Sequence, residues 1–146
     1  MAADEHGTVL RFNSLPPDCS MIIPVSKFAV IRSLTLHILG CGNPISMTLF
    51  SYAGADSFDS VDWSRWTINP KTLQFADLDH LPLINCQCKI CKRKKLDPIS
   101  RTLLHNLLFY KKFMDNLRSN IAKNNGLEFL DDYLDRKILS KIVKFF

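Results

Sequence analysis

The sequence predicts an α/β fold built from short parallel strands and helices, and three consecutive segments support this prediction. Residues 34–39 (LTLHIL) are rich in β-forming residues and almost entirely apolar, which is typical of a strand buried on both faces. Asn43 and Pro44 then provide a helix cap and a first helical residue, and Gly54 provides a stop. Residues 55–61 (ADSFDSV) follow as a second short strand. A strand, a helix and a strand in this order form a βαβ unit, whose strands are parallel.

The segments on either side of this unit carry weaker signals. Residues 1–20 show no clear periodicity and contain a Pro-Pro pair, so we expect no regular element there. Residues 22–33 (IIPVSKFAVIRS) are compatible with a helix, and the pattern of residues 62–91 is irregular.

Two helices are predicted in the C-terminal part of the chain. The first starts at Asp97 and Pro98 and ends near residues 124–126 (NNG). Its apolar residues recur at intervals of three and four, which places them on one helical face. The residues of that predicted face are Leu103, Leu107, Tyr110, Met114, Leu117 and Ile121. The last helix has acidic side chains in its first turns and lysines towards its end, an order that suits the helix dipole.

Composition narrows the class of protein. Of the 146 residues, 47% are hydrophobic and 23% are charged, which excludes an intrinsically disordered chain. No apolar run approaches the ~20 residues of a membrane span, and no secretory signal is visible. The five cysteines are an odd number and do not suggest a disulfide framework. We therefore expect reduced thiols, a cytoplasmic location and no membrane partner.

The net charge of +5 is unevenly distributed. Residues 1–85 carry five basic and eight acidic side chains, a net charge of −3, whereas residues 86–146 carry fourteen basic and six acidic ones, a net charge of +8. The densest basic group consists of Lys89, Lys92, Arg93, Lys94 and Lys95. A basic half predicts a polyanionic partner such as nucleic acid. The alternative is a solvated basic face with no partner.

The sharpest local motif is CQCKIC, which contains Cys86, Cys88 and Cys91. His105 follows, with thirteen residues between it and Cys91. Three thiolates and one imidazole form a closed tetrahedral ligand set for Zn²⁺, which is typical of a structural site. Zinc would fasten the cysteine loop to the helix that carries His105. The alternative is three unligated cysteines and a surface histidine. The remaining cysteines and histidines are interpreted as non-ligands: Cys19, Cys41, His6, His37 and His80.

A second candidate site is acidic. Three aspartates lie at or just after the second predicted strand, namely Asp56, Asp59 and Asp62. Functional side chains of parallel α/β folds gather at the carboxyl ends of strands. Strand alternation places Asp59 on the same face as Ser57, which makes Asp59 a candidate nucleophile or general base. Phe58 and Trp63 would shield its carboxylate from water. A solvated acidic loop is the alternative.

Three blocks in this order, LHILGCGNP, GADSFDSV and CQCKIC followed by HN, resemble the C-terminal part of the tRNA-guanine transglycosylase family. The resemblance extends from about residue 34 to residue 117. Members of this family exchange a guanine base for a 7-deazaguanine such as queuine, and their relatives include archaeosine enzymes and DpdA-like proteins that modify DNA.

The resemblance implies a (β/α)8 TIM barrel with a zinc-binding insertion after its eighth strand. Residues 34–39 would be strand seven and residues 55–60 strand eight. The chain would then divide into an N-terminal segment (1–33), the last βαβ of the barrel (34–66), and a zinc-binding subdomain with C-terminal helices (67–146). A complete barrel takes ~200–250 residues, so we expect this chain to be a C-terminal fragment of one.

The resemblance also implies roles for individual residues. The nucleophile of the family's FD motif falls on Asp59, and the zinc ligands fall on Cys86, Cys88, Cys91 and His105. Leu39 would pack on the substrate base, and Gly40 and Gly42 would let the backbone approach it. Arg65 is the one retained residue of the family's PTR motif, whose arginine contacts RNA. Trp63 and Ser64 depart from that motif.

The implied activity is replacement of guanine by a 7-deazaguanine in tRNA through a covalent aspartyl-nucleotide intermediate. We expect this chain to be inactive without the missing strands, which a second chain or a dimer partner would supply. Two alternatives stay open. One is a DpdA-like 7-deazaguanine transglycosylase acting on DNA. The other is a non-catalytic, zinc-stabilised module for nucleic-acid binding or dimerisation.

Overall fold

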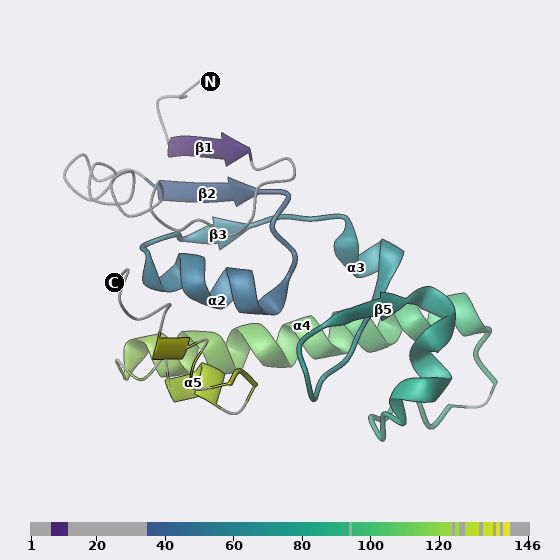
Figure 1. The fold of residues 1–146 in the computed structure, drawn as a ribbon. Coiled ribbons are helices and arrows are strands. Elements are labelled where there is room, and N and C mark those ends of the chain that lie inside the picture. The colour runs from purple at the N-terminus through teal and green to yellow at the C-terminus, as the bar shows by residue number, and fades with distance from the viewer. Residues whose placement is uncertain are drawn as a thin grey trace.

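The computed structural model describes residues 7–11, 35–93, 95–123, 125, 128–131, 133–135, 137 and 139–140 (Figure 1). The helix expected over residues 22–33 lies outside the described residues.

A parallel sheet of three strands forms one layer of the molecule. Its strands are β1 (Gly7–Arg11), β2 (Thr35–Leu39) and β3 (Ser57–Phe58), in the spatial order β1-β2-β3. Both pairings are parallel, so the predicted βαβ unit is confirmed. The expectation of no regular element in residues 1–20 is wrong for β1. This strand pairs with β2 along its whole length, and such a long-range contact leaves no local periodicity in a five-residue segment.

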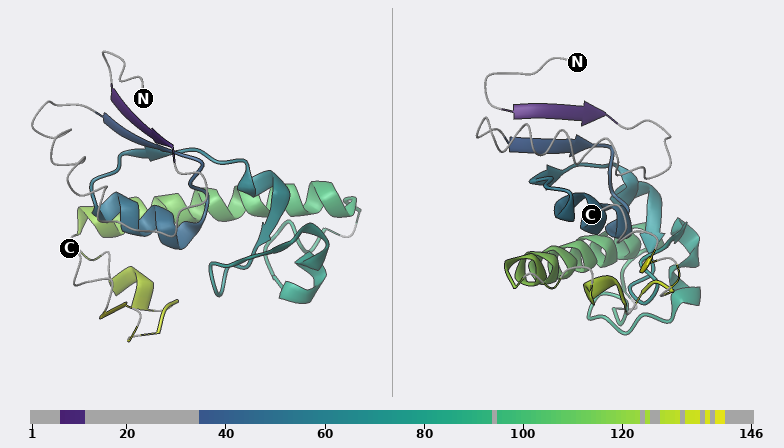
Figure 2. Two further views of the ribbon diagram at one scale, coloured as in Figure 1. Left: turned by 45° about the horizontal axis from the view of Figure 1, so that its top comes forward. Right: turned by 60° about the vertical axis from the view of Figure 1, so that its left-hand side comes forward.

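Only one face of β2 is fully buried, which corrects the expectation of a strand buried on both faces. Leu36 and Ile38 are 0% exposed, whereas His37 and Leu39 are only half-buried. The reason is that α2 (Pro44–Tyr52) and the helices beyond it cover one side of the sheet (Figures 1 and 2). The half-buried face of β2 is therefore available to a site.

Helix α2 forms where the sequence predicts it. The Asn43 side chain accepts hydrogen bonds from the backbone N–H groups of Ile45 and Ser46, and Pro44 is the first helical residue. The chain then turns at Gly54, which has a φ of 98°.

The segment after β3 contains short elements that the sequence pattern did not separate. They are α3 (Asp62–Arg65), the antiparallel strands β4 (Trp66–Ile68) and β5 (Phe75–Asp77), and a 3₁₀ helix, η2 (Leu78–Ile84). The cysteine loop, which carries Cys86, Cys88 and Cys91, follows η2.

Helix α4 (Pro98–Ala122) begins as predicted, because the Asp97 carboxylate accepts a hydrogen bond from the N–H of Ser100. Its buried face differs from the predicted apolar one, since Leu107 and Ile121 are exposed. The residues buried on α4 are Thr102, His105, Asn106, Phe113 and Leu117. The N-terminal half of this helix thus buries polar side chains, and the spacing of apolar residues cannot predict which polar side chains are buried.

The last predicted helix is interrupted. Helix α5 (Glu128–Asp131) is followed by a turn at Tyr133 and Leu134, whose N–H groups both donate to the Leu130 carbonyl. The acidic start is correct, but one continuous helix is not.

The apolar core lies between the sheet, α2 and α4. Its central members include Leu36, Ile38, Met47, Phe50, Phe113 and Leu117. Within the described ranges, no helix is both long enough and apolar enough to cross a membrane.

Candidate functional site

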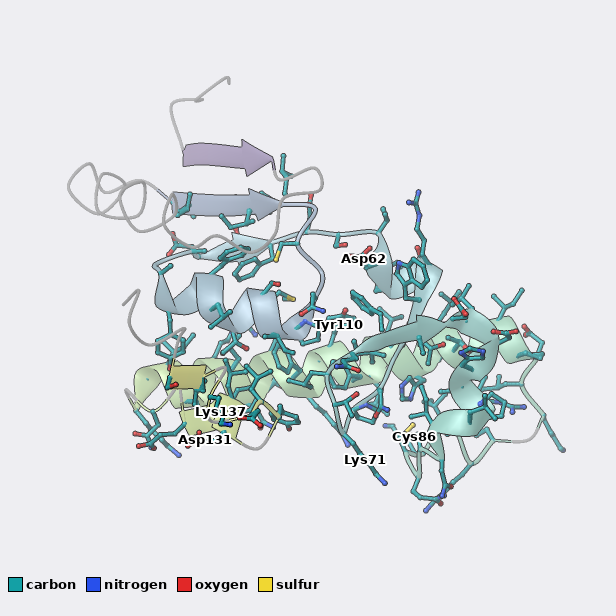
Figure 3. The ribbon with its side chains drawn as sticks, in the orientation of Figure 1. Asp62, Lys71, Cys86, Tyr110, Asp131 and Lys137 are labelled. Atoms are coloured by element: carbon teal, nitrogen blue, oxygen red, sulfur yellow. The ribbon has the colours of Figure 1, made fainter. Side chains whose placement is uncertain are left out.

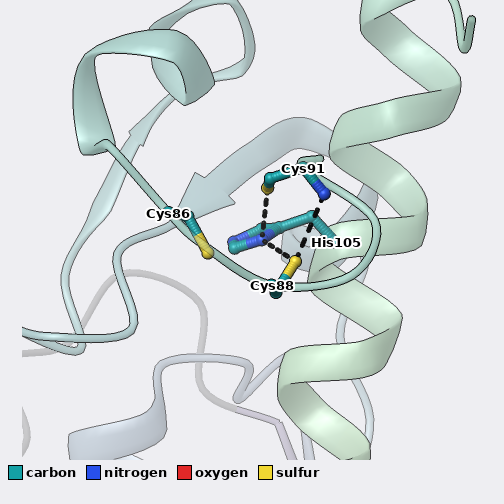
Figure 4. Close-up of side chains that lie close together, drawn as sticks. All are labelled: Cys86, Cys88, Cys91 and His105. Atoms are coloured by element: carbon teal, nitrogen blue, oxygen red, sulfur yellow. Dashed lines mark hydrogen bonds between the residues drawn. The ribbon is translucent and has the colours of Figure 1, made fainter. Parts of the chain in front are cut away.

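Four side chains predicted as metal ligands come together (Figure 4). Cys86, Cys88 and Cys91 come from the loop after η2, and His105 comes from the second turn of α4. Their ligand atoms all lie within 4.8 Å of one another. The Nδ1 atom of His105 is 3.4 Å from the sulfur of Cys91 and 3.7 Å from that of Cys88.

The orientation of the His105 ring is fixed by its other nitrogen. Nε2 lies 2.9 Å from the backbone carbonyl of Ile68, and the side chain is nearly inaccessible to solvent. Because a carbonyl only accepts hydrogen bonds, Nε2 carries the proton and donates it. Nδ1 therefore keeps its lone pair and points it at the sulfurs, as a metal-ligating histidine requires.

The electrostatics of the thiols favour ionisation of one of them. Burial raises the pKa of the Cys88 thiol, but the N–H of Cys91 and the ring of His105 outweigh it and lower the pKa to about 6. Burial raises the pKa of Cys91, as do the neighbouring Cys88 and Cys86. Crowded thiols of this kind become a stable thiolate set when a cation compensates their charge.

The donor set, its closeness and the fixed imidazole tautomer fit a structural zinc site, which confirms the predicted cofactor. Three sulfurs and one nitrogen fill the tetrahedral coordination of Zn²⁺ and leave no position for a substrate. The metal would fasten the cysteine loop to α4 and would take no direct part in catalysis.

Asn106, the neighbour of His105, holds the segment that follows β3. Its side-chain amide donates to the carbonyls of Trp63 at 2.7 Å and Trp66 at 2.6 Å, and its oxygen accepts from the N–H of Ile68 at 3.1 Å. The side chain is 0% exposed. Sequence reasoning used it only as part of the HN block and missed this role. The available signal was a polar residue on the buried side of a helix.

Tyr110 lies one helical turn further along α4 and reaches the turn after β2 (Figure 3). Its hydroxyl donates a 2.6 Å hydrogen bond to the carbonyl of Gly42. Burial raises the pKa of Tyr110, and the nearby Asp62 and Cys41 add to that rise, so the hydroxyl stays protonated. Helix α4 is thus hydrogen-bonded to the turn after β2 through Tyr110 and to the segment after β3 through Asn106.

Asp59 lies immediately after β3, at the strand end where the sequence predicts a functional carboxylate. Its Oδ1 accepts a 2.9 Å hydrogen bond from the N–H of Gly40, and its own N–H donates to the carbonyl of Ile38 at 3.3 Å. Its Oδ2 lies 3.7 Å from Nε2 of His37. The Asp59 side chain is 57% exposed. The expectation that Phe58 and Trp63 shield its carboxylate from water is therefore wrong.

The other two aspartates have local roles. Oδ2 of Asp56 accepts a 2.7 Å hydrogen bond from the N–H of Leu36, so this carboxylate ties β3 to the start of β2. Asp62 begins α3, and its N–H donates to the hydroxyl of Ser60. The carboxylate of Asp62 lies beside Gly42 in the turn after β2, and that of Asp59 accepts a hydrogen bond from the N–H of Gly40 at the start of the same turn.

The other residues predicted to bind substrate are Leu39, the glycines of the turn after β2, and Arg65. Gly40 has a φ of 72°, a conformation that favours glycine, and its N–H is the group that binds Asp59. A Cβ on Gly42 would lie 2.6 Å from Cβ of Ser60, so this turn packs directly on the chain after β3. Leu39 is half-buried at the end of β2, and Arg65 is exposed at the end of α3.

The described members of the basic group in and after the cysteine loop are on the surface. Lys89, Lys92, Arg93 and Lys95 are exposed, and Lys94 lies outside the described residues. These charges are available to a polyanion.

Helix α4 connects a cluster of cysteines and a histidine to the strand end that carries Asp59. The fold and these two sites define an α/β protein with a structural metal module and a polar site at the end of its sheet. Comparison with known protein families is consistent with this class. The profile of the family described as queuine tRNA-ribosyltransferase matches residues 18–137. The chain belongs to the tRNA-guanine transglycosylase family.

Individual relatives are similar over most of this chain. It is 26% identical over 126 residues to a tRNA-guanine(15) transglycosylase of Methanococcus maripaludis, an alignment that covers 76% of this chain and 19% of the relative. It is 24% identical to the enzyme of that name from Methanopyrus kandleri over 72% of this chain and 26% of the relative. It is 28% identical to a queuine tRNA-ribosyltransferase of Staphylococcus aureus over 68% and 32%. The chain therefore spans between about a fifth and a third of the length of these relatives.

Proposed function

We propose that this chain forms part of a base-exchange transglycosylase that replaces guanine by a 7-deazaguanine in tRNA. Family membership supports a tRNA-guanine transglycosylase-like function. The observation that carries the proposal further is the position of Asp59. Its carboxylate is anchored through Oδ1 to Gly40, while Oδ2 stays accessible at the shared end of β2 and β3.

In the proposed reaction, Oδ2 of Asp59 is the nucleophile. Its electron pair forms a bond to C1′ of the nucleotide while the bond from C1′ to guanine breaks, and guanine leaves with that electron pair. Positive charge develops on the sugar in the transition state, and the carboxylate stabilises it. The incoming 7-deazaguanine then loses a proton, attacks C1′ and displaces Asp59. Two displacements retain the configuration at C1′.

The remaining parts of the site are also proposals. Leu39 would pack on the substrate base, the backbone of Gly40 would approach it, and Arg65 would bind a phosphate. The group that moves protons to and from the bases would come from barrel strands outside this chain, without which we expect no activity. Three successive parallel strands, each beside the next, support placing β1, β2 and β3 in the wall of such a barrel.

The zinc centre has a positioning role in this proposal. The metal would hold His105, and the following polar residues of α4 bind the chain on both sides of the nucleophile. Asn106 bonds to Trp63 and Trp66, and Tyr110 bonds to Gly42. The exposed basic group beside the cysteine loop would contact phosphates.

DNA is the second candidate substrate. The segment after Asp59 supports this alternative, because Trp63 stands where the family has the proline of its PTR motif, and its side chain is 37% exposed. An exposed indole four residues after the proposed nucleophile offers a stacking surface for an unpaired base. In this alternative the chemistry at Asp59 is the same.

The test is covalent capture of nucleic acid by the full-length protein together with the rest of its barrel. The protein is incubated with tRNA or with DNA, quenched in denaturant and separated on a denaturing gel. We expect a tRNA adduct with the unaltered protein and none with Asp59→Asn. The control is Asp79→Asn, the same change at a distant exposed position, which should leave capture intact.

Each other outcome is informative. An adduct with DNA alone would support the second candidate. An adduct that survives Asp59→Asn would refute the assignment of the nucleophile. Zinc-bound, folded protein that binds nucleic acid but forms no adduct would support a non-catalytic module instead.

A further inference from the structure

We propose that His37 is the positioning residue for Asp59, an inference that rests on the proposed function. His37 occupies the middle of β2 and lies opposite Ser57 of β3 in the parallel register. Its ring bridges the two residues of the neighbouring strand end. Nδ1 is 2.7 Å from the hydroxyl oxygen of Ser57, and Nε2 is 3.7 Å from Oδ2 of Asp59.

The face on which these groups meet is the one that α2 leaves open. Leu36 and Ile38 point into the core on the covered side, and strand alternation directs His37 to the opposite side. The His37 side chain is 30% exposed and that of Asp59 is 57% exposed. The bridge therefore lies at the surface where a substrate would reach the carboxylate, and not in the structural interior.

The neighbours of the ring determine which tautomer suits the site. If Nδ1 carried the proton, the lone pair of Nε2 would face the Asp59 carboxylate and the two would repel. If Nε2 carries the proton, it points a donor at Oδ2, and Nδ1 accepts a hydrogen bond from the Ser57 hydroxyl. Ser57 thus orients the imidazole, and the imidazole presents N–H to Asp59.

The two oxygens of Asp59 consequently have different restraints. Oδ1 is fixed by the N–H of Gly40 at 2.9 Å, and Oδ2 faces the imidazole. A separation of 3.7 Å is longer than a hydrogen bond, and such contacts commonly shorten when substrate binds. Each carboxylate oxygen has two lone pairs, so Oδ2 can accept from His37 and still direct a lone pair at C1′.

This arrangement would assist both displacements. Before the first, the N–H of His37 holds the plane of the carboxylate so that Oδ2 points at the sugar. In the second, the bond between Oδ2 and C1′ breaks and the negative charge returns to Oδ2, where the same N–H stabilises it. The proton stays on Nε2 throughout, so His37 transfers no proton itself, and the protons of the leaving and incoming bases are moved by the separate acid–base group proposed above.

The activity test compares His37→Leu with His37→Gln in the full-length, catalytically competent protein. Leucine keeps bulk but has no donor, whereas the glutamine amide can still donate towards Oδ2. We expect His37→Leu to lower kcat for guanine exchange by about 100-fold, the effect of losing one donor to a developing charge. KM for tRNA should change little, and His37→Gln should recover part of kcat. Zinc content and the melting temperature should match those of the unaltered protein.

Two outcomes overturn the proposal. One is unchanged kcat in His37→Leu while Asp59→Asn blocks capture, which would leave the proposed function standing. The other is equal loss in the leucine and glutamine variants, which would indicate packing and not donation. If the unaltered protein exchanges no base at all, the proposed function itself fails, and that result is distinct from both.

A measurement that needs no activity keeps the inference testable in that event. Nitrogen chemical shifts of the His37 imidazole, observed by NMR in the full-length protein, report the tautomer. We expect a proton on Nε2 and a shift of its signal in Asp59→Asn. A proton found on Nδ1, or an Nε2 signal unaffected by that substitution, would refute the bridge.

Discussion

The hydroxyl of Tyr110 donates a 2.6 Å hydrogen bond to the backbone carbonyl of Gly42, and this bond joins the metal-bearing helix to the turn after β2. His105 is five positions earlier on the same helix. Gly42 in turn packs on Ser60, one residue after the candidate nucleophile. The metal centre and the strand-end carboxylate are therefore parts of one unit, joined by this hydrogen bond and this packing contact.

Removing that hydroxyl should loosen the unit. Tyr110→Phe leaves the Gly42 carbonyl without its donor, and we expect the free energy of unfolding to fall by about 1–2 kcal/mol. Urea denaturation measures the change. The matched control is Tyr52→Phe, because the Tyr52 hydroxyl is buried with no hydrogen-bond partner among the described residues. That substitution should be neutral or stabilising, and an equal loss in both variants would contradict the assigned role of the Tyr110 bond.

Asn106 should contribute more, because it satisfies three buried backbone groups at once. Asn106→Ala strands the N–H of Ile68 and the carbonyls of Trp63 and Trp66. We expect a loss of about 3 kcal/mol in unfolding free energy. Asn116→Ala, at an exposed position of the same helix, should change it little. Comparable stability of the two variants would show that the Asn106 bonds contribute nothing net.

Local signals explain what could be predicted from the sequence. Asn43 and Asp97 cap their helices with their own side chains, and the three cysteines of CQCKIC are close in the chain. These features depend on neighbours within a few residues. The βαβ unit, the start of α4 and the metal ligands were therefore correctly predicted.

The features that were missed depend on contacts between distant residues. Strand β1 exists because β2 pairs with it, and the buried face of α4 includes His105 and Asn106 because they bond to β4. The interpretation of His37 as a non-ligand stands, but its contacts to Ser57 and Asp59 could not be predicted because they cross between two strands. Periodicity records which residues are apolar, but it does not record which polar groups will find partners.

Metal removal should unfold the region around the cysteine loop. We expect about one zinc per chain by elemental analysis, and loss of both zinc and thermal stability with Cys88→Ser or a strong chelator. Cys19→Ser changes a cysteine interpreted as a non-ligand and should retain the metal. Native stability in metal-free protein would contradict the structural role, and loss of zinc with Cys19→Ser would contradict the ligand assignment.

The contact between Gly42 and Ser60 can be tested by compensation. A methyl group at residue 42 would lie 2.6 Å from both Cβ and Oγ of Ser60 and 2.8 Å from Oδ2 of Asp62. Gly42→Ala should therefore cost about 1–3 kcal/mol in unfolding free energy, as overpacking does. Ser60→Gly removes the two closest atoms, so the double variant should recover part of that loss. Such coupling is measured by a double-mutant cycle in urea. Strictly additive effects would mean that the two loops do not press on each other in solution, and the close packing of the turn after β2 against the nucleophile segment would then be wrong.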